Sequence, residues 1–224
     1  MTFSLAARDP DTGAFGIVVS SSSPAVAARC AHVRAGVGAV TSQNVTNPDL
    51  GRVGLEALAS GAGPADAVCA MVAADGFPEY RQLSAVSVSG ETAAHSGAET
   101  LGTHTSVTGD AAVVAGNLLA TESVAHAMLG GYTGSRAEAF EERLLDGYAA
   151  ALAAGGEEGP VRSVGLVVAE DVPWAVTDLR VDDADEPFGE LLRLWQLWAP
   201  QKAAYRLRGL DPRRAPSYGV PGDA

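Results

Sequence analysis

The amino-acid sequence predicts an α+β protein folded as a four-layer α-β-β-α sandwich of two antiparallel sheets. Three observations predict this class. The chain opens with two strand-like segments joined by a turn, and pairs of such strands alternate with pairs of helices along the rest of the chain. Of its 224 residues, 47% are hydrophobic and 19% are charged, which is a globular balance. Antiparallel strand pairs argue against a doubly wound parallel sheet.

The first element is expected to be a hairpin. Hydrophobic side chains at alternate positions predict a half-buried strand over residues 2–7. The segment 9–13, Asp-Pro-Asp-Thr-Gly, is a turn sequence, because Pro presets φ and Gly accepts a positive φ. A returning strand follows over 15–20. A loop of this length places Thr2 opposite Ser20, so the serines that end the second strand should lie beside Thr2.

Hydrophobic periodicity and helix-breaking residues predict the later elements. Helical segments are expected at 24–34 (a short helix or turn), 50–60, 64–74, 121–129, 136–154 and 188–198. Strands are expected at 36–42, 82–89, 92–96, 111–115, 163–169 and 174–179. We find no internal repeat and no linker, so the sequence predicts one domain over residues 1–208, with a flexible tail over 209–224 that is rich in proline.

Charge and composition exclude several classes of function. The net charge of −12 argues against a nucleic-acid partner, which requires a concentrated basic surface. No segment has the length and hydrophobicity of a membrane span or the pattern of a targeting peptide, so we expect a cytoplasmic protein without a membrane partner. The four histidines have no i,i+4 partner, and neither a metal nor an organic cofactor is expected. Cys30 and Cys69 are interpreted as small buried hydrophobic residues.

Thr2 is the strongest catalytic candidate. A threonine at the second position is small enough for removal of Met1, and we expect no targeting segment ahead of it. Thr2 would then carry a nucleophilic hydroxyl beside its own α-amine, whose pKa of roughly 7.7–8.0 lets it accept a proton near neutral pH. Ser4 lies two residues along the same strand face and could orient that amine. The adjoining Arg8-Asp9 pair is either a turn cap or a contact to substrate.

Two further segments offer amide side chains. Gln43 lies in an amide-rich strand end at 41–48, and Asn117 follows Gly116 at the end of an apolar strand. Neutral amide donors suit an oxyanion hole, although an Asx turn at Asn47 and a helix cap at Asn117 are the structural alternatives. Alternating charges at 178–183 indicate either a surface ion-pair cluster or an arginine for a substrate carboxylate. The substrate-binding candidates are Arg8, Asp9, Ser20, Ser21, Asn44, Thr46, Asn47 and Arg180.

These motifs, taken in order, resemble a family of small bacterial and archaeal proteins that is assigned to the N-terminal-nucleophile (Ntn) hydrolase superfamily and was long catalogued as a domain of unknown function. The resemblance spans about residues 1–198. It rests on Met-Thr-Phe-Ser-Leu-Ala-Ala-Arg-Asp at 1–9 and Gln-Asn-Val-Thr-Asn-Pro at 43–48, where Ser42 replaces the usual threonine. It also rests on Gly-Asn-Leu at 116–118 and Asp-Leu-Arg-Val-Asp-Asp at 178–183. It implies the sandwich fold, a threonine nucleophile and amidohydrolase chemistry.

We therefore expect an Ntn-type amidohydrolase that cleaves a C–N bond of a small amide or ureido compound through a covalent Thr2 intermediate. Gln43 and Asn117 are the expected oxyanion donors. The resemblance suggests a ureido acid, such as ureidoacrylate, as substrate. The alternatives are a threonine peptidase and a non-catalytic metabolite-binding or interaction module. We expect a homodimer, and the apolar residues of the last helix are either core or interface: Leu191, Leu194, Trp195 and Trp198.

Overall fold

The computed structural model describes residues 2–220, which contain ten strands and seven α-helices. The strands are β1 (Thr2–Arg8), β2 (Phe15–Ser21), β3 (Ala31–Arg34), β4 (Gly38–Asn44), β5 (Arg81–Ser87), β6 (Thr92–Ser96), β7 (Thr105–Gly109), β8 (Ala112–Asn117), β9 (Ser163–Ala169) and β10 (Ala175–Val181). The helices are α1 (Val26–Cys30), α2 (Asp49–Ala59), α3 (Pro64–Ala74), α4 (Ser123–Gly134), α5 (Phe140–Ala153), α6 (Pro187–Trp198) and α7 (Lys202–Leu210). Short 3₁₀ turns occur at Pro78–Tyr80 and Pro212–Arg214.

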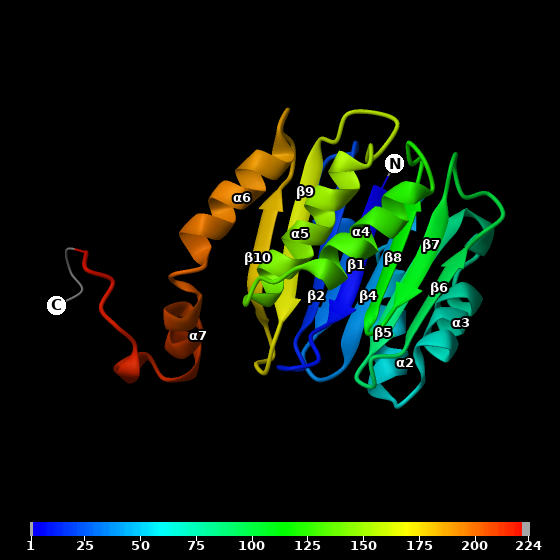
Figure 1. Cartoon of the computed structure of the whole chain (residues 1–224). Helices are drawn as coiled ribbons and strands as arrows, with labels where there is room; N and C mark the ends of the chain where they lie inside the picture. The colour runs from blue at the N-terminus through cyan, green and yellow to red at the C-terminus, as the bar shows by residue number, and fades with distance from the viewer. Residues whose placement is uncertain (1, 221–224) are drawn as a thin grey trace.

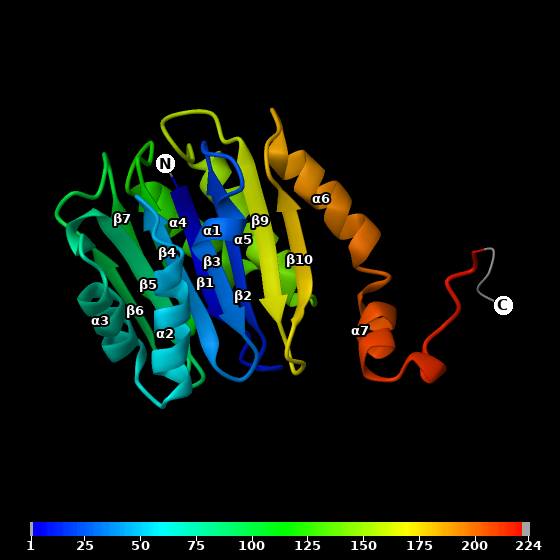
Figure 2. The same ribbon diagram turned by 180° about the vertical axis from the view of Figure 1, so that it is seen from behind.

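The strands form two stacked antiparallel sheets, and helices cover both outer faces. The larger sheet has the order β10-β9-β2-β1-β8-β7 and the smaller one the order β3-β4-β5-β6. Figure 1 shows α4 and α5 in front of the larger sheet, and Figure 2, from behind, shows α2 and α3 covering the smaller sheet. Hydrophobic clusters fill the space between each sheet and its helices, and a third cluster lies between the sheets. The predicted α-β-β-α sandwich is confirmed.

The register of the opening hairpin differs from the predicted one by a single residue. Phe3, and not Thr2, is paired with Ser20, and Arg8 with Phe15 is the last pair before the loop. The loop is longer than expected because the Asp9 backbone N–H donates to the carbonyl oxygen of Ala14 at 2.8 Å. A shift of one residue moves every side chain to the other face of a strand. Ser21 therefore shares the face of Thr2, and Ser20 points to the opposite, helix-covered face.

The layer between the sheets has an apolar half and a polar half. Toward the Asp9 turn it is filled by hydrophobic side chains that include Ala6, Ile17 and Val86. Toward the other end of β1, the inward positions carry buried polar side chains instead: Thr2, Ser4, Ser21, Thr41, Gln43, Gln82, Ser84 and Asn117. Buried polar groups cost free energy unless they are hydrogen-bonded, so this half of the layer must contain a connected network.

Three elements were absent from the sequence prediction. The predicted 24–34 segment is a helix only to Cys30, after which β3 pairs with β4. The strand β7 pairs with β8 at the edge of the larger sheet, and α7 follows α6. β3 and β7 are short, partly exposed strands, so they lack the apolar alternation on which prediction depends. Cys30 is buried as expected, but Cys69 is exposed on α3, and both are free thiols.

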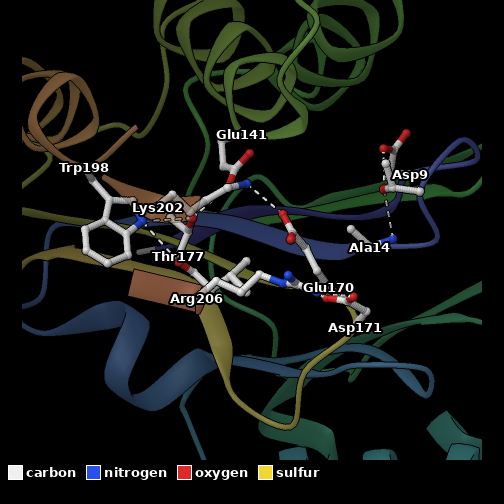
Figure 3. A network of polar contacts seen from close by, with 11 residues as sticks. Asp9, Ala14, Glu141, Glu170, Asp171, Thr177, Trp198, Lys202 and Arg206 are labelled. Carbon is white, nitrogen blue, oxygen red and sulfur yellow. Dashed lines mark hydrogen bonds and ion pairs between the residues drawn. The ribbon is translucent and has the colours of Figure 1, made fainter. Parts of the chain in front are cut away.

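Partly buried ionic contacts hold α7 against the body of the protein (Figure 3). Lys202 donates to the carboxylates of Glu141, at 2.9 Å, and Glu170, at 2.7 Å. Glu141 is buried and also accepts from the Thr177 hydroxyl at 2.7 Å. The indole N–H of Trp198 donates to the backbone of Val176 at 3.1 Å. The ordered structure therefore continues through α7.

The segment predicted as a flexible tail contains the end of α7 and a short 3₁₀ turn. α7 ends at Leu210, and a 3₁₀ turn follows at Pro212–Arg214. The guanidinium of Arg208 lies 3.8 Å from the ring centroid of Tyr218. Residues 221–224 lie outside the described part of the chain, and the flexibility of 209–224 stays a prediction.

Among residues 2–220, no helix has both the length and the hydrophobicity to cross a bilayer.

Candidate active site

Thr2 occupies the first position of β1, at the polar end of the layer between the sheets. β1 is a central strand, flanked by β2 and β8. Thr2 is paired with Asn117 across the β1–β8 ladder, and its hydroxyl donates to Ser21 Oγ at 3.3 Å. Only 4% of Thr2 is exposed. Three of the predicted site residues, from three neighbouring strands, are thus brought together.

A chain of amide side chains connects the two sheets beside this cluster. The Ser4 hydroxyl donates to Gln43 Oε1 at 2.6 Å, and Gln43 Nε2 donates to Gln82 Oε1 at 2.9 Å. Asn117 Nδ2 also donates to Gln82 Oε1, at 3.0 Å. Gln82 Nε2 in turn donates to the Gly116 carbonyl oxygen at 3.0 Å. All four polar side chains are fully buried, so the network fixes their positions.

This network distinguishes the roles open to Gln43 and Asn117. Gln43 accepts at Oε1 and donates at Nε2 to both Gln82 and the Ala115 carbonyl oxygen. Asn117 instead has a carbonyl oxygen, Oδ1, that is buried without a hydrogen-bond partner among the described residues. Gln82 determines the amide orientation of Asn117, because a flipped amide would set two carbonyl oxygens against each other. Asn117 therefore offers an acceptor beside Thr2, and the expected role of Gln43 and Asn117 as oxyanion donors stays a prediction.

Glu157 is a buried carboxylic acid close to the same strand ends, and the sequence analysis missed it. It lies in the loop between α5 and β9, is 6% exposed, and accepts from the Ser22 backbone N–H at Oε2, at 3.1 Å. Its Oε1 has no hydrogen-bond partner among the described residues. Burial raises the pKa of Glu157 to about 7, and the hydrogen bonds from Ser22 only partly offset this. No sequence signal distinguishes Glu157 from its neighbour Glu158 as a buried residue.

The predicted Arg8-Asp9 pair lies at the opposite end of β1 from Thr2. The six intervening residue steps of an extended strand correspond to about 20 Å. Asp9 accepts from the Thr12 hydroxyl at 2.6 Å and from Arg143 at 2.7 Å. Burial alone would raise the pKa of Asp9, but these two partners outweigh it and hold the pKa below its usual value. These contacts are those of a turn cap, the structural alternative.

The remaining candidates are spread over neighbouring loops and strands. Asn44 donates to the Tyr80 carbonyl oxygen at 2.7 Å, and the Thr46 hydroxyl contacts the Cys30 thiol at 3.4 Å. Asn47 Oδ1 accepts from the backbone of Asp49 at 3.2 Å, as an Asx turn does. Arg180 forms an ion pair with Asp178 at 3.4 Å on β10, three strands away from β1, or about 14 Å. These contacts hold loops and strand edges in place and do not reach Thr2.

The site holds no set of ligands for a metal ion. Across residues 2–220, no three His, Cys, Asp or Glu side chains are grouped so that they could bind one. The cluster beside Thr2 offers hydroxyl groups, amide groups and one carboxyl group of raised pKa.

Comparison with known proteins places the chain in a family. The model of a family of unknown function, DUF1028, matches residues 2–191. The chain belongs to the DUF1028 family. A crystal structure of a DUF1028 protein from Silicibacter pomeroyi is similar, with a TM-score of 0.81 and 33% sequence identity over 88% of both chains. No curated protein matches the sequence.

A second solved structure gives a much weaker match. It is the Anbu (Gly-1) mutant from Hyphomicrobium sp. strain MC1, with a TM-score of 0.40 and 14% identity over 93% of this chain and 100% of that one. The DUF1028 family description states no activity.

Proposed function

We propose that this DUF1028 protein is an N-terminal-nucleophile amidohydrolase that cleaves a C–N bond of a small amide or ureido compound. The observation that carries the proposal is the position of Thr2. Its side chain lies between the sheets beside Ser21 and Asn117, in the half of the layer that is otherwise closed by buried amides. A small polar substrate would find hydrogen-bonding groups there and no bulk water.

The reaction begins once the bond between Met1 and Thr2 has been cleaved. The free α-amine of Thr2 takes the proton of the Thr2 hydroxyl, directly or through a water, while Oγ1 forms a bond to the substrate carbonyl carbon. The resulting ammonium group returns the proton to the leaving nitrogen as the C–N bond breaks. Water then attacks the acyl- or carbamoyl-threonine with the α-amine as base, and this restores the Thr2 hydroxyl.

The neighbouring side chains divide into those that contact the reacting groups and those that position them. Ser21 orients the Thr2 hydroxyl, and Asn117 Oδ1, which has no partner within residues 2–220, accepts from an N–H of the substrate. Ser4, Gln43 and Gln82 satisfy each other and hold Asn117 in place. A ureido group carries more N–H donors than a simple amide, so a buried acceptor beside the nucleophile that lacks a hydrogen-bond partner among the described residues favours a ureido acid such as ureidoacrylate. No cofactor enters the scheme.

The experiment is a substrate screen with variants of Thr2. Small amides, ureido acids and a short peptide amide are incubated with the protein, and ammonia or amine release is measured. Thr2→Ala should reduce kcat at least about a hundredfold, whereas Thr2→Ser keeps a hydroxyl and should retain part of the activity. Thr108→Ala, on the exposed edge strand, is the matched control. Equal turnover by wild type and Thr2→Ala would refute the proposal, and cleavage of the peptide alone would favour a threonine peptidase.

A further inference from the structure

The loop between α5 and β9 crosses the end of the larger sheet at the start of β1. On the β8 side, the Ala120 N–H donates to the Gly156 carbonyl oxygen and the Glu158 N–H donates to that of Leu118, both at 3.0 Å. On the β2 side, the Arg162 N–H donates to the Ser21 carbonyl oxygen at 2.9 Å. Figures 1 and 2 both show this loop arching over the end of the sheet beside the label of the N-terminus.

The Glu157 side chain spans the position that lies in line with β1, one residue before Thr2. Its backbone forms a bridge with Leu119, beyond the end of β8, while its carboxylate accepts from Ser22, beyond the end of β2. The strands β8 and β2 lie on either side of β1, so they are about 9.6 Å apart. These two contacts lie on either side of β1, so the geometry points to a Glu157 side chain that passes close to the backbone nitrogen of Thr2.

The carboxylate of Glu157 has an unused acceptor at this place. Oε2 is held by the Ser22 N–H, and Oε1 is buried without a hydrogen-bond partner among the described residues. A buried carboxylate needs a cation or several donors to be stable in its charged form. The α-amine of Thr2, formed by cleavage after Met1, would supply such a cation.

We propose that Glu157 is a positioning residue that binds the α-amine of the mature Thr2 through Oε1 and directs its lone pair toward Thr2 Oγ1. The inference rests on the proposed function for its catalytic meaning, but the contact itself does not depend on any substrate. When the amine takes the hydroxyl proton, it becomes an ammonium ion, and the adjacent carboxylate stabilises that charge. Glu157 itself gains and loses no proton in the cycle.

The first test measures the α-amine and needs no activity. The protein is produced as a ubiquitin fusion whose removal leaves Thr2 as the first residue. The pKa of the α-amine is obtained from the pH dependence of its acetylation, followed by peptide mass spectrometry. A neighbouring carboxylate raises the pKa of an amine. Glu157→Gln should therefore lower the α-amine pKa by about 1 unit or more, because an opposite charge this close usually shifts a pKa by about 1–3 units. Glu158→Gln, one residue away and exposed, should leave it unchanged.

The second test uses the pH profile of kcat. Glu157→Gln should reduce kcat about tenfold or more and move the ascending limb to lower pH, since the amine then loses its proton more easily. Glu157→Asp, which keeps the charge, should restore part of the rate and the original limb. An α-amine pKa equal in wild type and Glu157→Gln would overturn the proposal, whatever the activity. A clear pKa shift without any amide hydrolysis would keep the contact and refute only the proposed function.

Discussion

Asn117 and Gln82 are joined by a hydrogen bond of 3.0 Å that ties the end of β8 in the larger sheet to β5 in the smaller one. The same Gln82 oxygen accepts from Gln43, and its nitrogen donates to the Gly116 backbone. One buried amide thus organises the polar half of the layer between the sheets. The position of the acceptor beside Thr2 depends on it.

The change Gln82→Glu tests this organising role with almost no change in shape. It replaces the Nε2 donor by an acceptor that faces the carbonyl oxygen of Gly116, and it buries a charge. We expect a loss of about 2–4 kcal/mol in the free energy of unfolding at pH 8, and a smaller loss at pH 4, where the carboxyl can be protonated. Urea denaturation at both pH values measures the difference. Gln196→Glu, exposed on α6, is the control, and equal losses in the two variants would contradict the role.

The variants Ser21→Ala and Ser20→Ala test which of the two serines lies beside Thr2, through their effects on kcat/KM. Ser21 accepts from the Thr2 hydroxyl, whereas Ser20 points to the other face of the sheet, beside Tyr148. One hydrogen bond contributes about 1 kcal/mol, so Ser21→Ala should lower kcat/KM about five- to tenfold. Ser20→Ala should change it less than about twofold. Steady-state kinetics on the same substrate measures both effects. A larger loss for Ser20→Ala than for Ser21→Ala would favour the register predicted from the sequence, in which Ser20 lies opposite Thr2.

Asp9→Asn tests the turn cap through its pH dependence. The pKa of Asp9 is lower in the folded protein than in the unfolded chain, because Thr12 and Arg143 outweigh the effect of burial. Such a carboxyl stabilises the fold above the unfolded pKa, near 4, and this contribution is lost as the pH falls through the lower folded value. Asp9→Asn should therefore cost about 1–2 kcal/mol at pH 7 and progressively less below about pH 4.

Chemical denaturation over this pH range follows the cost of Asp9→Asn. Asp11→Asn, on the exposed part of the same turn, should cost almost nothing at any of these pH values. A cost that stays constant down to pH 2 would show that the ion pair does not act as described.

Lys202→Met tests how α7 is held. It leaves the buried carboxylate of Glu141 without its cation, so we expect a loss of about 1–3 kcal/mol in the free energy of unfolding. Arg193→Met removes an exposed ion pair with Glu190 and should cost at most about 0.5 kcal/mol. Thermal unfolding of both variants gives the comparison. A neutral Lys202→Met would mean that hydrophobic packing alone holds the C-terminal helices.

Hydrophobic alternation and turn chemistry were enough to predict the sandwich, because its central strands and amphipathic helices depend on local patterns. The predicted hairpin register was wrong because the loop between Asp9 and Ala14 is one residue longer than expected. The hydrophobic alternation of the two strands does not reveal the length of the loop. The apolar residues of α6 were expected to be either core or dimer interface, and two of them, Leu191 and Trp195, are buried in the core. The homodimer stays a prediction. Leu197 on α6 is an exposed hydrophobic side chain that such an interface could cover.

The candidate site was only partly predictable for a related reason. The sequence places Thr2, Ser21 and Asn117 at the ends of predicted strands, so their proximity could be expected. Gln82 and Glu157 were not, because their roles come from contacts between sheets and across a loop that no spacing in the sequence reveals.

The most direct measurement is mass spectrometry of the protein after reaction with p-nitrophenyl acetate. If Thr2 is the nucleophile, the intact mass should lack Met1, and fragmentation should find one acetyl group on Thr2. The group should be released by hydroxylamine, which cleaves esters and spares amides, so an O-acyl adduct is distinguished from acetylation of the α-amine. A chain that retains Met1, or an acetyl group that is found on other residues only, would contradict an N-terminal threonine nucleophile in this protein.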